Sequence, residues 1–279
     1  MATLVGGVTT SHVPAIGRAI AQNLQQEPYW KPWFDGFPPV RRWLAEVRPD
    51  VAVVFYNDHG LNFFLDKMPT FAVGAAPTYE NDDEGWGIPT LPPYRGDPAL
   101  SWHLIEALIE REFDVTTCQE MRVDHAFTLP LKLLWPDDEV CPVRTVPVCI
   151  NTVQFPLPSA ARCFRLGQAV GDAIRAWDSD ARVLVVGTGG LSHQLDGERA
   201  GFINRDFDRA FMASLIDDPK WATQYSIEDL VELTGTQGVE LLMWLAARAA
   251  LGDAARQVHA NYHIPISNTA AGLMAMAPA

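Results

Sequence analysis

The chain has few of the features that would assign it to a membrane, secreted or zinc–thiolate class. No stretch approaches the ~20 consecutive apolar residues of a membrane-spanning helix, so we expect no membrane association. The N-terminus, MATLVGGVTTSH, has no basic segment followed by a long apolar run, which argues against a secretory signal. The four cysteines contain no CxxC pair, so a zinc–thiolate site is not expected. We therefore expect reduced thiols and a cytoplasmic protein.

Positive charge is also scarce. The sequence has 21 Lys and Arg against 34 Asp and Glu, giving a formal net charge of −13. A field of this sign repels phosphate backbones, so nucleic acid is not an expected partner. It also repels an anionic small molecule. Such a substrate would need a local source of positive charge, for example a metal ion.

The residues that are present indicate an α/β domain. The chain has 279 residues and is 48% hydrophobic, enough to bury a substantial core. Nearly continuous apolar runs predict buried strands, separated by stretches with helical spacing, so we expect helices on both faces of a sheet. The long segment Ala76–Asp97 is expected to be a loop. The predicted strands are Leu4–Thr9, Val51–Tyr56, Arg144–Cys149 and Val183–Val186, and the predicted helices include Ala99–Phe113, Ala160–Trp177 and Val239–Leu251.

Histidines follow three of the predicted strands. LVGGVT leads to His12, VAVVFY leads to His59, and VLVV leads to His193. Ligands bind outside the carboxyl ends of strands in open α/β sheets. One such histidine is more often a hydrogen-bonded loop residue, but three together favour a functional site. His125, from the polar turn VDHA, could reach the same edge, so all four remain eligible as metal ligands.

Glu240 is the candidate carboxylate ligand. It lies at the start of the predicted helix GVELLMWLAARAAL, and the apolar residues around it make burial of a lone charge costly. An acidic residue in a first helical turn also favours the helix dipole, which is an equally simple explanation. Two histidines and a carboxylate suit non-haem Fe(II) oxygenases, and zinc accepts the same ligands. The HExxH zinc motif is absent. Ligand type alone leaves both a redox enzyme and a zinc-dependent hydrolase open.

A family resemblance covers nearly the whole chain. The segments TSHVPAIG, FYNDHG, DEGWGIP, VDHAFTLPL, VGTGGLSHQL, GFINRDFD, GVELLMW and HIPISNTAAG occur in this order. Together they resemble the class III extradiol ring-cleavage dioxygenases. The resemblance implies one α/β catalytic domain over residues 1–279. Its central mixed sheet would be flanked by helices, with the active site at the C-terminal ends of the strands.

The resemblance also implies a role for each matching residue. Fe(II) would be bound by His12, His59 and Glu240. His193 would be the catalytic acid/base, and His125 would help to hold the substrate or the oxygen intermediate. Three residues would lie on the substrate side of the site: Asn57, His125 and Ser267. Asn57 would also lie beside the iron ligands, and Ser267 would lie near a substrate carboxylate.

The reaction implied is the opening of a catechol by O2. Protocatechuate would be cleaved at the 4,5 bond to give 4-carboxy-2-hydroxymuconate semialdehyde. Gallate, methylgallate or another catechol is the alternative substrate, and a zinc-dependent hydrolase is the alternative of a different class. A small helical alpha subunit is an expected partner, in a hetero-oligomer such as α2β2. No segment of this chain looks like that subunit.

Overall fold

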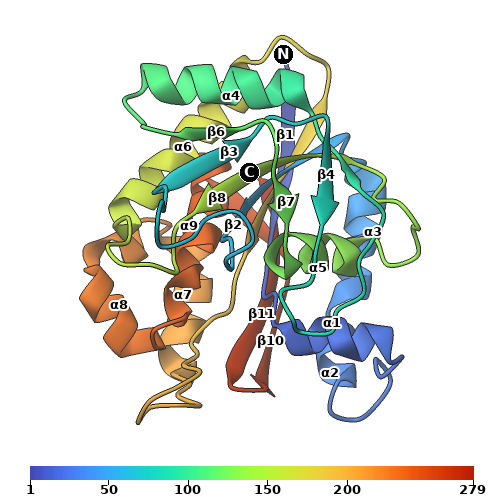
Figure 1. Ribbon diagram of the computed structural model, residues 1–279, viewed down its shortest axis with the longest axis vertical. Coiled ribbons are helices and arrows are strands. Elements are labelled where there is room, and N and C mark those ends of the chain that lie inside the picture. The colour runs from blue at the N-terminus through green and yellow to red at the C-terminus, as the bar shows by residue number, and fades with distance from the viewer.

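An eight-stranded mixed sheet is the centre of the computed structural model, which describes the backbone of residues 1–279 and every side chain except that of residue 265. The strands of this sheet are β1 (Thr3–Thr10), β2 (Val51–Tyr56), β3 (Phe71–Gly74), β6 (Thr116–Cys118), β8 (Arg144–Ile150), β9 (Arg182–Thr188), β10 (Ala255–Ile266) and β11 (Thr269–Pro278). Their order is β10-β11-β1-β9-β2-β8-β3-β6, and helices surround the sheet (Figure 1). Strands β1, β9, β2 and β8 are parallel neighbours, whereas β11 runs antiparallel to β1 and β10. The parallel strands therefore end at one shared edge.

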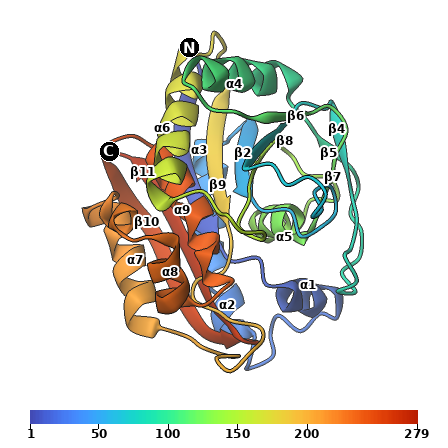
Figure 2. The same ribbon diagram turned by 60° about the vertical axis from the view of Figure 1, so that its left-hand side comes forward.

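Helices cover both faces of the sheet, as the turned view shows (Figure 2). Alternate side chains of β2 enter two separate buried clusters, with Val53 and Phe55 in one and Val54 and Tyr56 in the other. This confirms the predicted fold class. Helices on the Val54 side are α1 (Pro14–Ala21), α2 (Lys31–Phe34), α3 (Phe37–Val47) and α5 (His125–Leu134). Those on the Val53 side are α4 (Pro98–Glu110), α6 (Ala160–Ala176), α7 (Arg205–Asp217), α8 (Ile227–Thr234) and α9 (Leu241–Ala250), with the 3-10 helices η1 (Trp221–Gln224) and η2 (Gly238–Glu240).

Helices α6 and α9 pack with their backbones in contact. A Cβ atom added at Gly167 would lie 2.1 Å from the Ala246 carbonyl oxygen, and one at Gly171 would lie 2.1 Å from that of Ala250. Only glycine allows so close an approach. Because Glu240 directly precedes α9, this packing fixes the place at which its carboxylate enters the site.

The predicted strands and helices are present in the structure, with ends that differ by a few residues, but not every element was predicted. The segment Ala76–Asp97 is not only a loop. It contains β4 (Thr78–Asn81) and β5 (Tyr94–Arg95), which form a small sheet with β7 (Arg122–Val123) because Tyr79 and Tyr94 are buried beneath it. The long β10–β11 hairpin was also not predicted. Among the helices described, none combines the length and apolar character needed to cross a membrane.

Candidate functional site

The shared edge of the parallel strands opens into a cavity of about 360 Å³. His12 lies two residues beyond β1, His59 three beyond β2, and His193 five beyond β9. The strand-end argument thus placed these histidines at one edge. The cavity is lined by every site residue predicted from the sequence: His12, Asn57, His59, His125, His193, Glu240 and Ser267.

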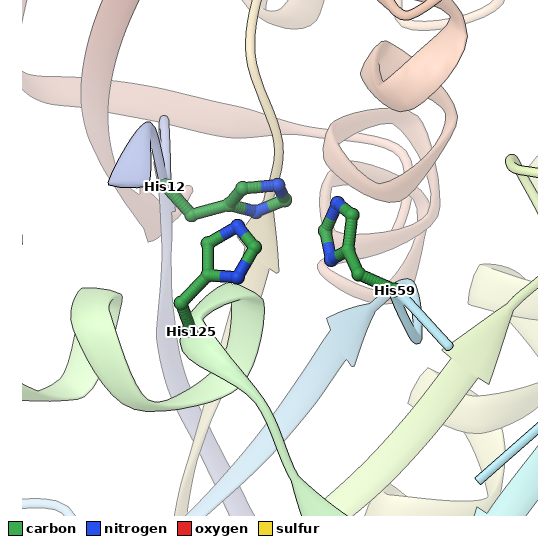
Figure 3. Close-up of side chains that lie close together, drawn as sticks. All are labelled: His12, His59 and His125. Carbon is green, nitrogen blue, oxygen red and sulfur yellow. The ribbon is translucent and has the colours of Figure 1, made fainter. Parts of the chain in front are cut away.

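Three imidazole rings that line this cavity lie close together (Figure 3). His12, His59 and His125 each offer a ring nitrogen, and the three nitrogens lie within 4.8 Å of one another. The ring centroids are 5.3 Å apart for His12 and His59 and 4.4 Å apart for His59 and His125. Imidazole geometry alone therefore keeps His125 eligible as a ligand beside His12 and His59.

The Glu240 carboxylate lies against two of these rings. Its Oε2 is 3.4 Å from His12 Nε2, and its Oε1 is 3.6 Å from His59 Nε2. The Gly190 N–H donates to Oε2 at 2.7 Å, and the Asn57 amide donates to Oε1 at 3.2 Å. Burial alone would raise the pKa of Glu240, but the nearby histidines hold it well below its usual value. Glu240 is thus a buried carboxylate aimed at His12 and His59.

His59 is oriented by a buried aspartate that the sequence analysis did not select. Asp124 Oδ2 accepts from His59 Nδ1 at 3.0 Å and from the His59 backbone N–H at 2.7 Å. Burial opposes charge on both groups, yet their hydrogen bond lowers the pKa of Asp124 and helps to raise that of His59. A histidine held in this way presents Nε2 to a metal. The sequence offered one signal for Asp124: an aspartate directly before a helix often caps it, and Asp124 Oδ1 accepts from the Ala126 N–H at the start of α5.

His125 and His193 are held in the same tautomer. His125 Nδ1 lies 2.8 Å from Glu84 Oε1, and His193 Nδ1 lies 2.9 Å from the Leu191 carbonyl oxygen. Because an ionised carboxylate and a carbonyl only accept, each Nδ1 carries a proton, and in the neutral ring it is then Nε2 that holds the lone pair. Glu84 comes from the segment predicted as a loop, 41 residues from His125, and no sequence pattern connects the two.

The chemistry of these donors fits a divalent metal ion. Two ligands of one ion, each about 2 Å from it, lie no more than about 4 Å apart. Glu240 Oε2 is 3.4 Å from His12 Nε2 and Glu240 Oε1 is 3.6 Å from His59 Nε2, so each histidine meets this limit with a different oxygen of the carboxylate. In the part of the chain that the structure describes, Asn57 Oδ1 is buried beside these groups without a hydrogen-bond partner. Two imidazoles and a carboxylate suit Fe(II) or Zn(II).

Comparisons with known proteins identify the family of this chain. Residues 6–274 match the family described as the catalytic LigB subunit of aromatic ring-opening dioxygenase. A gallate dioxygenase of Pseudomonas putida is 39% identical over 66% of this chain, and the match spans 54% of that longer protein. A 2,3-dihydroxyphenylpropionate/2,3-dihydroxicinnamic acid 1,2-dioxygenase of Photorhabdus laumondii is 30% identical over 95% of this chain and 94% of its own length.

A solved structure supports the fold alone. The crystal structure of the uncharacterized protein JW3007 from Escherichia coli K12 superposes with a TM-score of 0.57 at 15% identity, covering 97% of this chain and 99% of that one. The family assignment rests instead on the sequence match over residues 6–274 and on the 30% identity across nearly the full chain. This chain belongs to the family of catalytic LigB subunits of aromatic ring-opening dioxygenases.

Proposed function

We propose that residues 1–279 form the catalytic beta subunit of a cytoplasmic extradiol dioxygenase that opens protocatechuate at the 4,5 bond with O2 and Fe(II). The product would be 4-carboxy-2-hydroxymuconate semialdehyde. One observation carries this proposal: His12, His59, Glu240 and His193 line a single cavity in a chain of the ring-opening family. A small helical alpha subunit would complete a hetero-oligomer such as α2β2.

The proposed metal ligands are His12, His59 and Glu240. Fe(II) held there supplies the redox chemistry that O2 activation needs and that Zn(II) lacks. The chain contributes ligand orientation: Asp124 fixes His59, and Gly190 and Asn57 fix the Glu240 carboxylate. These contacts would hold the three proposed ligands in place when the metal ion and a catechol bind.

Proton transfer is assigned to His193. Its Nε2 lies 3.9 Å from Glu240 Oε2, so the ring reaches the cavity beside the proposed ligands. The Nδ1–H of His193 donates to the Leu191 carbonyl oxygen. In the neutral ring, Nε2 can then accept the proton of a substrate hydroxyl and later return it. His125 Nε2 is free in the same way and would accept a hydrogen bond from the second hydroxyl.

Gallate is the second candidate substrate. The observation in its favour is the 39% identity to the gallate dioxygenase over 183 residues. Gallate carries the same ring carboxylate as protocatechuate and one more hydroxyl. The metal site and His193 would therefore act on either substrate, and residues at the cavity wall would decide between them.

The test is O2 uptake by the chain loaded anaerobically with Fe(II), across a panel of catechols, with and without a candidate small subunit. We expect a yellow ring-cleavage product with protocatechuate or gallate. His193→Ala should retain bound iron and lose most turnover, whereas Glu240→Ala should lose the iron. A purified chain that holds zinc and consumes no O2 with any catechol would refute the dioxygenase proposal.

A further inference from the structure

Arg18 brings a permanent positive charge to the cavity. Helix α1 begins two residues after His12, and its residues Pro14, Ala15 and Arg18 all line the cavity wall. Positions three and four residues apart share one face of a helix, so these three residues form the cavity-facing side of α1. The guanidinium of Arg18 is thus carried on the same short segment that supplies a proposed metal ligand.

The other lining residues leave the charge of Arg18 unmatched. Glu240 is the sole acidic side chain among the described residues that line the cavity, and its two oxygens accept hydrogen bonds from Gly190 and Asn57. Arg18 is exposed, and no described carboxylate lies within ion-pair distance of it, in contrast to Arg122, Arg144 and Arg175. An arginine without an internal partner at a cavity wall is free to bind an anionic ligand.

The other polar residues that line the cavity cannot replace this charge. Thr236, Gln237 and Thr269 line the cavity and are neutral. Ser267 also lines it, but its backbone N–H already donates to the Tyr29 hydroxyl at 3.0 Å. A neutral hydroxyl contributes one hydrogen bond and does not offset the field of a chain whose net charge is −13.

We propose that Arg18 binds the carboxylate of the aromatic substrate and selects acidic catechols over neutral ones, an inference that rests on the proposed function. The guanidinium presents a planar fork of N–H donors that matches a carboxylate with two parallel hydrogen bonds. The two catechol hydroxyls would face His193 and His125, and the ring carboxylate would face α1. Arg18 is then a specificity-determining residue, which the sequence analysis did not identify.

Binding under anaerobic conditions tests the proposal without turnover. The Fe(II)-loaded chain is titrated calorimetrically with protocatechuate and with 3,4-dihydroxybenzamide, its uncharged analogue. We expect Arg18→Met to weaken binding of the acid about tenfold to hundredfold, which corresponds to the loss of charge-assisted hydrogen bonds. Binding of the amide should change less than about threefold. Arg18→Lys should give an intermediate loss, because it keeps the charge and loses the fork.

Arg111→Met is the matched control. It removes the same charge from the end of α4, and Arg111 does not line the cavity. This variant should bind both compounds like the unaltered chain. The proposal is overturned if the unaltered chain shows no preference for the acid, or if Arg18→Met and Arg111→Met weaken acid binding equally. Ring cleavage is scored separately with O2, so a chain that prefers the acid and cleaves no catechol would refute only the dioxygenase activity.

Discussion

Replacing Asp124 with asparagine should weaken metal binding without removing a proposed ligand. The Asp124 carboxylate accepts three hydrogen bonds, from the backbone N–H of His59, from His59 Nδ1 and from the Ala126 N–H. Asparagine retains one acceptor oxygen, which is enough to cap α5. Its NH₂ group, which only donates, then faces the two His59 donors. The His59 ring can then change to the tautomer that carries its proton on Nε2, the atom that should face the metal.

The size of the effect follows from these contacts. Loss of a hydrogen-bond partner behind a metal-binding histidine typically costs about tenfold to hundredfold in metal affinity. That range equals about 1.4–2.7 kcal/mol. The His59 backbone N–H, left without an acceptor beside the fully buried Asp124 side chain, should cost a further ~1–3 kcal/mol of folding free energy. Metal affinity and stability should therefore both fall in Asp124→Asn.

Competition with a chelator under anaerobic conditions measures the affinity, and urea unfolding of the metal-free chain measures the stability. Asp97→Asn is the control, because Asp97 is also buried and caps a helix, α4, with no contact to the cavity. It should lose stability and keep its metal affinity. If Asp124→Asn bound Fe(II) as tightly as the unaltered chain, the assignment of His59 as a ligand oriented by Asp124 would be wrong.

Two further predictions concern Glu84, which holds His125, and Asp208, which is bonded to Ser192 next to His193. Glu84→Ala should leave His125 Nδ1 without its acceptor at 2.8 Å and lower kcat about tenfold or more, with unchanged iron content, while Glu84→Gln, which keeps an acceptor, should retain most activity. Burial raises the pKa of Asp208 above its usual 3.8, although Ser192 and Tyr262 donate to it. A carboxyl with a raised pKa in the folded state contributes stability that is complete below about pH 3.8 and is lost as the pH rises through the folded-state pKa. Urea unfolding at a series of pH values should therefore show the unaltered chain losing stability relative to Asp208→Asn over that window. Equal pH dependence of the two chains would contradict this.

The sequence predicted the sheet and the edge at which the site forms, because both depend on local pattern. Val51–Tyr56 is a strand with the predicted bounds, and its apolar run reflects burial on both faces. The rule that ligands bind at the carboxyl ends of strands then predicted that His12, His59 and His193 lie together, and all three line one cavity. The residues behind the site were not predictable in this way. Glu84 meets His125 across 41 residues of chain, and this contact depends on how the small β4–β5–β7 sheet folds over α5.

The ranking of Glu240 above His125 as a ligand can be argued from burial and charge. The contacts at Nδ1 do not rank the histidines, because Glu84 holds the His125 ring as Asp124 holds the His59 ring. Glu240 is only 5% exposed, and its ion-pair partners among the described residues are three histidines, with no lysine or arginine. A buried carboxylate without a permanent cation is costly unless a metal ion neutralises it. Charge compensation therefore favours Glu240 as a ligand, whereas the choice of His12 and His59 over His125 rests on the family resemblance.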